Sequence, residues 1–213
     1  MRTSRRQGFW YVPGRLYDLA FGVILRGVRR RVAAAVRTED LFPWLDVCCG
    51  TGSQFRALGA GDASGRVIGL DKSAGMVRYA AARAPGIPFV CGDAAQLPFK
   101  DGAFRAVSVS FGLHDKSPGV RSAIIREARR VLAPGGRLIA VDFENPWNAK
   151  SRVAAFFVWT IERLASGEHY RNGRDFLRRG GLRAFIRENG FEETTRRNIE
   201  AGSLSVVVAR PVE

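Results

Sequence analysis

The chain has 213 residues, of which 46% are hydrophobic and 25% are charged, so it is long enough to bury one full core and too short to promise two. Its longest apolar runs reach half of the roughly 18 to 20 residues that cross a membrane, and the arginine-rich start lacks the features of a secretory signal, so we expect a cytoplasmic protein. The net charge of +14 attracts polyanions such as nucleic acid, anionic lipid or an acidic substrate, without choosing among them.

The first segment of the chain is basic and then amphipathic. Residues 1–12 combine arginine with aromatic side chains, which predicts an arm outside the core. From Pro13 to Val36, apolar residues recur at helical spacing while arginines crowd the later turns, so we predict one or two helices. The arm and these helices make up residues 1–38.

Five short apolar runs then alternate with helical or turn-rich stretches. They read "WLDVCC", "RVIGLD", "IPFVCGD", "FRAVSVSF" and "GRLIAVDF". Strands that alternate with helices predict a parallel sheet covered on both faces, which is a doubly wound α/β fold. We predict that residues 39–145 form this core within a single domain, 1–213.

The helix with the strongest signals lies between the fourth and fifth of these runs. Ser117 suits the N-cap, Pro118 suits the first helical position, and Pro134 begins the stop signal "PGG". We predict a solvated charged face that includes Arg121. The predicted apolar face consists of Val120, Ile124, Ala128 and Val131.

The last third of the chain changes character. Residues 145–165 predict an aromatic-rich amphipathic helix, which an arginine-heavy stretch follows. Two closing strands are predicted near 192–197 and 203–210. We therefore separate a helical segment, 146–190, which would lie on the substrate side, from the C-terminal strands, 191–213.

The cysteines and histidines do not form a metal pattern. Cys48 and Cys49 are adjacent and Cys91 stands alone, which gives neither a disulfide framework nor a CxxC pair. Because the sequence has only two histidines, His114 and His169, we expect no zinc or other metal site. All three thiols are predicted to be small buried groups.

Three acids fall where predicted strands end, namely Asp46, Asp71 and Asp93. In a doubly wound sheet, ligands bind beyond the carboxyl ends of the strands. Gly50 and Gly52 let the backbone pass close to a ligand, because a Cβ at either position would obstruct it. Asp71 lies nineteen residues after Gly52, about the spacing at which an acid binds both ribose hydroxyls, so a nucleoside ligand is predicted.

The kind of nucleoside follows from a missing glycine. A dinucleotide fingerprint needs a third glycine and brings a pyrophosphate to the helix N-terminus, but Phe55 stands at that position. Asp46, ahead of the turn, would repel an anion and attract an ammonium or a sulfonium. This is the charge pattern of S-adenosylmethionine, with its amino group at Asp46, its ribose at Asp71 and its adenine at Asp93.

Five motifs resemble, in their order and spacing, the class I S-adenosylmethionine-dependent methyltransferases: "LDVCCGTG", "VIGLDKSAGMV", "CGDAAQLPF", "FRAVSVSFGLHD" and "VLAPGGRLIAVDF". The resemblance covers about residues 15–145 and is greatest to the quinone C-methyltransferases that make ubiquinone and menaquinone. It implies a Rossmann-like, mostly parallel sheet of seven strands with an antiparallel C-terminal hairpin. The chain departs from this branch at His114, where the quinone enzymes usually carry arginine.

The resemblance also implies which residues hold the cofactor. Asp46 and the glycine pair would hold the methionyl part, Asp71 the ribose, Met76 the adenine face, and Asp93 with the following alanine the adenine edge. The backbone after the fourth strand would close the pocket, and Tyr17 resembles the tyrosine at which that branch folds an N-terminal helix over the cofactor. Together with their motif neighbours, the cofactor-binding candidates are Tyr17, Asp46, Cys48, Gly50, Thr51, Gly52, Asp71, Lys72, Met76, Asp93, Ala94, Ser110, Phe111 and Gly112.

Catalysis of methyl transfer needs few side chains. The enzyme mainly holds donor and acceptor collinear and dry, with a base only if the acceptor must lose a proton. His114 follows the fourth strand on the ligand-binding edge and could deprotonate a phenol, or a ring carbon activated by one, or it could serve only as a hydrogen-bonding group. His169 and Tyr170 are rival candidates, for which a surface turn is the alternative.

The acceptor is predicted to be a small hydrophobic or aromatic molecule, quinol-like in character. Nearby arginines suit collection of such a molecule from an anionic membrane surface, so a peripheral location on the inner face of a membrane is a second expectation. The oligomeric state is left open. The aromatic residues expected to line the acceptor pocket are Trp10, Tyr11, Phe143, Trp147, Phe156, Phe157 and Trp159.

Three other functions stay open at this point. O- or N-methylation of a soluble metabolite or of a phospholipid headgroup fits the same motifs. RNA methylation is favoured by charge, but the sequence has no RNA-binding module and no adenine-amino signature after the fourth strand, so a nucleic-acid partner is not expected. A protein that binds the cofactor without turnover would yield no methylated product.

Overall fold

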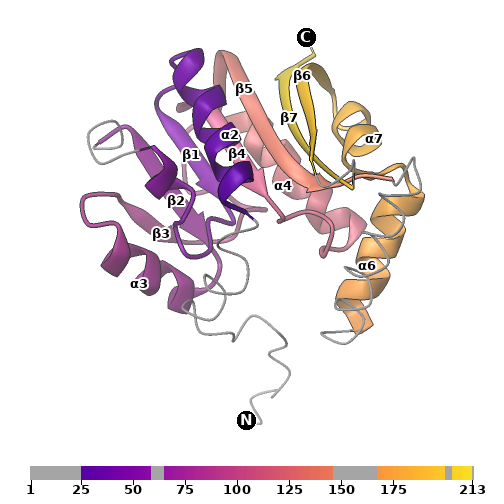
Figure 1. Cartoon of the computed structure of the whole chain (residues 1–213), viewed down its shortest axis with the longest axis horizontal. Helices are drawn as coiled ribbons and strands as arrows, with labels where there is room; N and C mark the ends of the chain where they lie inside the picture. Colours follow the sequence, from indigo (N-terminus) through magenta and orange to yellow (C-terminus); the bar gives the residue numbers. More distant parts are fainter. Residues whose placement is uncertain (1–24, 59–64, 146–166, 200–202, 213) are drawn as a thin grey trace.

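One seven-stranded sheet forms the centre of the computed structural model, which describes residues 25–58, 65–145, 167–199 and 203–212 (Figure 1). The strand order is β3-β2-β1-β4-β5-β7-β6. The order reverses between β1 and β4, which is the point where a doubly wound sheet binds its ligand. The strands are β1 (Trp44–Val47), β2 (Val67–Asp71), β3 (Phe89–Cys91), β4 (Phe104–Ser110), β5 (Leu132–Phe143), β6 (Phe191–Ile199) and β7 (Leu204–Pro211).

The first five strands are parallel and the last two form an antiparallel hairpin. β1 pairs in parallel with β2 and β4, and β4 pairs in parallel with β5. β7 is inserted antiparallel between β5 and β6. The predicted doubly wound sheet with its closing hairpin is therefore confirmed.

Helices cover both faces of the sheet. On one face α2 packs against β5, β7 and the short helix η2, and on the other α4 and α7 pack against β5. α6 contacts α7, and α3 lies against β2 and β3. The helices are α2 (Arg26–Thr38), η2 (Phe55–Ala57), α3 (Ala74–Arg83), α4 (Pro118–Val131), α6 (Gly167–Arg178) and α7 (Gly181–Glu188).

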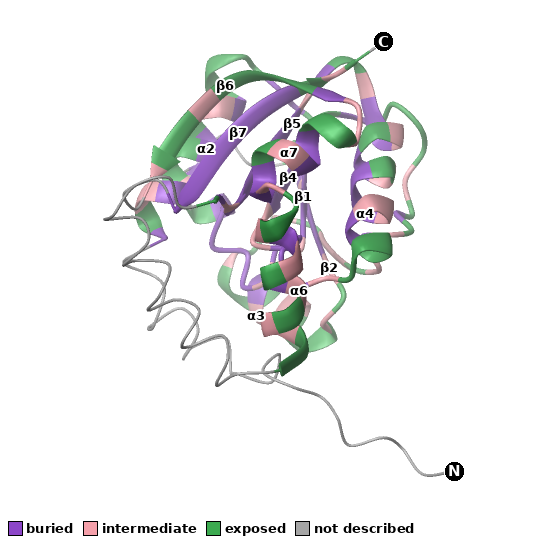
Figure 2. Ribbon diagram, turned by 90° about the vertical axis from the view of Figure 1, so that its right-hand side faces the viewer, coloured by how far each residue is buried: buried purple, intermediate pink, exposed green. Residues whose placement is uncertain are grey.

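Alternate residues of the central strands feed two separate cores. In β5, Leu138 and Ala140 join the core under α4 and α7, whereas Ile139 and Val141 join the core under α2. Successive side chains of a strand point to opposite faces, so a strand covered on both sides reads as a continuous apolar run. The sheet edge differs from the centre. Figure 2 shows that β7 is buried, whereas the outermost strand, β6, is largely exposed.

The faces of α4 differ from the prediction, although the helix begins at Pro118 as expected. Val120 is 40% exposed, so its place on the apolar face was wrong, and Ile125 is buried instead. Arg121, predicted to be solvated, is only 2% exposed and pairs with Asp175 of α6 at 2.8 Å. The reason is that α6 covers the first turns of α4, which helical periodicity within one segment does not reveal.

The thiols were predicted to be buried, and this is wrong for Cys91. Cys49 is buried and Cys48 is half-buried, but Cys91 is exposed. Cys91 ends β3, which is the edge strand of the sheet and only three residues long, so no neighbouring strand covers its outer side.

The Arg121–Asp175 pair yields a stability prediction. Asp175→Ala would leave the buried Arg121 guanidinium without its carboxylate, and we expect a loss of about 2 to 3 kcal/mol in the free energy of unfolding. Arg179→Ala is the matched control, because Arg179 is an exposed partner of the same carboxylate at 2.9 Å and should cost less than about 0.5 kcal/mol. Urea unfolding measures both, and equal losses would mean that the buried arginine is not the cause.

Several predictions fall outside the described residues, since residues 1–24 and 146–166 are not among them. Within the described part, no helix combines the length and the apolar character that a membrane crossing requires. The predicted site residues outside the described part are Tyr17, Trp10, Tyr11, Trp147, Phe156, Phe157 and Trp159.

Candidate functional site

The acid of the first strand, Asp46, is buried just before the turn. Its carboxylate, 3% exposed, accepts a hydrogen bond from the Ser108 hydroxyl, whose oxygen accepts the Trp44 indole N–H at 2.7 Å. Desolvation by burial raises the pKa of Asp46 to about 7, although the Ser108 hydrogen bond opposes the shift. A cationic ligand beside Asp46 would stabilise its ionised form, which burial disfavours.

The turn after β1 runs through left-handed backbone at both glycines. Gly50 has φ +54° and Gly52 has φ +67°. A Cβ on Gly50 would meet no described atom within 4 Å, which agrees with a space for a ligand. A Cβ on Gly52 would come within 2.8 Å of the Phe89 ring, so close packing inside the protein also excludes a side chain there.

Asp71 and Asp93 are oriented by backbone and side-chain donors. The Asp71 carboxylate accepts the Gly50 N–H at 2.9 Å and the Ser73 N–H at 2.8 Å. Asp93 accepts from the Ala95 N–H and from the Lys72 ammonium, and the Lys72 hydrogen bond is the main cause that lowers the pKa of Asp93. Since a carboxylate offers about four acceptor positions, both acids keep capacity for donors of a ligand.

The stretch after β4 bends toward the glycine turn. Phe111 has φ +56°, and its N–H donates to the Val141 carbonyl at 2.8 Å. A Cβ on Gly112 would lie 2.9 Å from the Cys48 sulfur, so the two predicted loops are in contact. The Ser110 hydroxyl is buried and has no hydrogen-bond partner among the described residues.

These groups fit S-adenosylmethionine in charge and hydrogen-bonding capacity. The carboxyl ends of β1, β2 and β3 supply one acid each, and acids suit an ammonium, two ribose hydroxyls and an adenine amino group better than a pyrophosphate. The unpartnered Ser110 hydroxyl adds a polar group at the same edge of the sheet. A buried polar group without a partner is uncommon in proteins and calls for an explanation, and a ligand bound beside it is one.

Comparisons with known proteins agree with this chemistry. A family model described as "Methyltransferase domain" matches residues 45–136. The demethylmenaquinone methyltransferase of Beutenbergia cavernae is 34% identical, in an alignment that covers 93% of this chain and 87% of that protein. The protein of the same name from Streptomyces griseus is 37% identical over 134 residues, which cover 61% of this chain and 56% of that protein.

The chain belongs to the class I S-adenosylmethionine-dependent methyltransferases, in the quinone C-methyltransferase branch. It is therefore an enzyme that uses S-adenosylmethionine as its cofactor. A solved S-adenosylmethionine-dependent methyltransferase from Thermotoga maritima has the same fold, with a TM-score of 0.64, 20% identity, and coverage of 94% of this chain and 98% of that one.

His114 is held by a buried carboxylate of the neighbouring strand. Its Nδ1 lies 2.7 Å from Oδ1 of Asp142, which is the second-to-last residue of β5 and is fully buried. The other oxygen of Asp142 accepts the backbone N–H groups of Leu113 and His114 at 3.1 and 3.2 Å. Phe143 packs edge-on against the imidazole, with ring centroids 4.7 Å apart. Asp142 thus fixes both the ring and the loop that carries it.

Asp142 was missed by the sequence reasoning, although a signal for it exists. It stands at the carboxyl end of the fifth predicted strand, which is the position that singled out Asp46, Asp71 and Asp93 at the first three. What the sequence does not give is the pairing register that brings Asp142 beside the loop after β4.

The remaining predicted site residues of the methyltransferase lie in α6, in the glycine turn after β1, in α3 and after β3. His169 and Tyr170 lie half-buried in the first turn of α6, and the Asn172 amide of that helix donates to the Asp115 carbonyl at 2.9 Å. The start of α6 therefore lies beside the loop that carries His114. The buried Thr51 hydroxyl forms a hydrogen bond with the Ser53 hydroxyl. Met76 is half-buried in the first turn of α3, and Ala94 is buried. Burial raises the pKa of the Cys48 thiol to about 12.

Proposed function

We propose that this methyltransferase methylates a hydroxylated aromatic ring, a quinol-like acceptor, with His114 as the general base. The observation that supports the proposal most strongly is the 2.7 Å contact between Nδ1 of His114 and the buried Asp142 carboxylate. With the Nδ1 proton donated to Asp142, the lone pair of His114 lies on Nε2. An imidazole in that tautomer is ready to accept a proton from a phenol.

The base has a defined task in this reaction. The cofactor supplies the methyl group on a sulfonium, for in-line displacement by the acceptor. Nε2 of His114 takes the proton of the acceptor hydroxyl, and the electron pair of the broken O–H bond enters the ring and makes the neighbouring carbon nucleophilic. Asp142 stabilises the imidazolium that forms, because its carboxylate is buried and already bonded to Nδ1. Once the new carbon–carbon bond is complete, the ring carbon releases its proton to solvent, and the electron pair of that C–H bond restores the aromatic ring.

In the same proposal, the cofactor lies along the ends of the first three strands. Asp46 faces its ammonium group, the free acceptor positions of Asp71 take the two ribose hydroxyls, and Asp93 takes the adenine amino group. Lys72 serves by orienting Asp93, with which it pairs at 2.7 Å, rather than by touching the cofactor. The Ser110 hydroxyl would find its missing partner in the bound cofactor or acceptor.

The choice of a quinol-like acceptor is supported by two observations. The relatives described above carry the name demethylmenaquinone methyltransferase, and that name specifies a quinone-type acceptor. In this chain the Phe143 ring lies beside His114, which gives an apolar surface next to the base.

The test uses purified protein, labelled S-adenosylmethionine and demethylmenaquinol in detergent. We expect label in the lipid fraction with the reduced quinol and none with the oxidised quinone, because the quinone has no hydroxyl proton for a base to remove. Fractionated cell extract, assayed in parallel, shows whether another acceptor competes. Transfer of label to a polar metabolite alone would reject the quinol acceptor, and cofactor binding without any labelled product would reject catalysis.

A further inference from the structure

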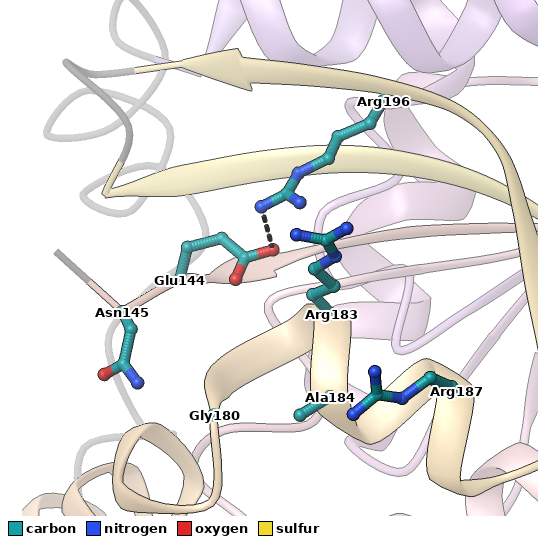
Figure 3. Close-up of a pocket in the computed structure, with 7 residues that line it drawn as sticks. All are labelled: Glu144, Asn145, Gly180, Arg183, Ala184, Arg187 and Arg196. Carbon is teal, nitrogen blue, oxygen red and sulfur yellow. Dashed lines mark ion pairs between the residues drawn. The ribbon is translucent and has the colours of Figure 1, made fainter. Parts of the chain in front are cut away.

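A pocket lies away from β1, β2 and β3, between the end of β5, the start of α7 and β6 (Figure 3). It has a volume of about 450 Å³. Three of its lining side chains are arginines and one is an acid. The lining residues used below are Glu144, Arg183, Arg187 and Arg196.

The acid, Glu144, is already committed to the protein. It is 5% exposed, it accepts the backbone N–H of Arg183 in the first turn of α7, and Oε1 lies 3.2 Å from the Arg196 guanidinium. This last contact is close but is not aligned as a hydrogen bond. Glu144 therefore occupies the positive end of α7 and neutralises part of one guanidinium, while the side chains of the other two arginines extend from α7.

Arg183 and Arg187 carry the excess charge of the pocket. They are four residues apart on α7, so they share one side of the helix, and both are exposed. Among the described residues, no carboxylate forms an ion pair with either side chain. Figure 3 shows that Arg183 and Arg196, from α7 and β6, both point toward the Glu144 carboxylate. With three guanidinium groups against one carboxylate, the pocket has a net charge of about +2.

We propose that this pocket binds a phosphate group, as a monoester or a diester. Guanidinium groups recognise phosphate through paired N–H donors, and several of them converging on one cavity are a recurrent phosphate site. The volume exceeds that of a phosphate ion and leaves room for the group that carries it. The proposal does not depend on the acceptor of the methyl group, because none of these arginines takes part in the chemistry at His114.

The position of the pocket gives the phosphate a role. Glu144 follows Asp142 by two residues, so the pocket begins where the strand that holds His114 ends. A phosphate anchored there would hold its carrier at the acceptor side of the enzyme. The carrier is either a phospholipid of a membrane surface or a soluble phosphorylated molecule, and the two differ in an experiment.

The test compares two double variants of the full chain at constant ionic strength. Arg183→Gln with Arg187→Gln removes the two guanidinium groups of α7, and we expect at least about tenfold weaker binding of inorganic phosphate by calorimetry. Arg78→Gln with Arg126→Gln removes the same charge from exposed positions on α3 and α4 and should change the affinity less than twofold. Equal losses in both variants, or no phosphate binding by the unaltered chain, would overturn the proposal.

Two further arms complete the experiment. Glycerol phosphate and vesicles containing phosphatidylglycerol serve as probes. If the carrier is soluble, the α7 variant should lose affinity for glycerol phosphate and not for the vesicles. If the carrier is a lipid, the α7 variant should lose affinity for the vesicles. Should the α7 variant fail to fold, Glu144→Gln replaces it. That change removes the competing carboxylate, so it should tighten phosphate binding severalfold, and weaker binding would contradict the proposal.

Discussion

Asp46→Asn is expected to weaken S-adenosylmethionine binding by at least about 30-fold, because it removes the buried carboxylate proposed to face the ammonium group. The Asn side chain keeps the volume of Asp46 and still accepts the Ser108 hydrogen bond. The loss therefore reports charge rather than packing. Calorimetric titration of the purified variant with S-adenosylmethionine measures it, and Glu193→Gln, an exposed carboxylate on β6, is the control that should bind normally.

The same variant should gain stability without cofactor. The folded pKa of Asp46 is about 7 against an ordinary value of 3.8, so the folded state binds more protons between these values and stability falls as pH rises through that window. Above pH 7 the ionised carboxylate costs the folded chain free energy on the order of a few kcal/mol, which Asp46→Asn removes. A variant that is less stable than the unaltered chain at pH 8 would show that Asp46 is a structural group.

Cofactor affinity of the unaltered chain should follow the same titration. A cationic ligand prefers the ionised carboxylate, so affinity falls as pH drops below about 7, by up to about tenfold per pH unit. In Asp46→Asn this slope should disappear. A slope that persists in the variant would assign the effect to another group.

His114→Gln is expected to lower kcat by a factor of about 10² to 10⁴ while S-adenosylmethionine binds as before, because the change removes the proposed base and leaves the proposed cofactor residues intact. Asp142→Asn should have a similar effect. The Asn amide can donate to Nδ1, which moves the imidazole proton to Nε2 and removes the lone pair that the acceptor needs. The double variant should be no slower than either single one, since both remove the same function.

Two measurements separate this catalytic role from a structural one. With S-adenosylmethionine saturating at every pH, the rising limb of the kcat profile against pH should vanish in His114→Gln, and an acceptor with a more acidic phenol should restore more activity to this variant than to the unaltered enzyme. His169→Gln is the matched control, since His169 lies in α6 beside the same loop. If His169→Gln lost kcat and His114→Gln kept full activity, His169 and not His114 would be the base.

The sheet was predictable because its signals are local. Short apolar runs that alternate with helical stretches define a parallel sheet covered on both faces, and the two closing strands were placed within a few residues of β6 and β7. The order of acids and glycines in the first three strands also predicted the cofactor. Two residues distinguished S-adenosylmethionine from a dinucleotide. Asp46 supplies a negative charge that suits a cationic ligand, and Phe55 stands where a dinucleotide-binding fingerprint needs its third glycine.

The errors came from contacts between segments distant in the sequence. Arg121 looks like a solvated residue of α4 until α6 covers it and supplies Asp175 fifty-four residues later. Cys91 looks like a buried strand residue until its strand proves to be the sheet edge. Neither fact is encoded in the residues next to these positions.

The functional site also combines features that the sequence predicted with features that only the folded structure shows. The sequence by itself determined the fold, the cofactor and the histidine after β4, because each depends on residue types at fixed spacing along the chain. Only the tertiary structure decided that Asp142 holds His114, that burial brings the pKa of Asp46 to about 7, and that arginines of α7 and β6 share a pocket. Distances between strands and exclusion of water are properties of the packed molecule, so they appear only once the chain has folded.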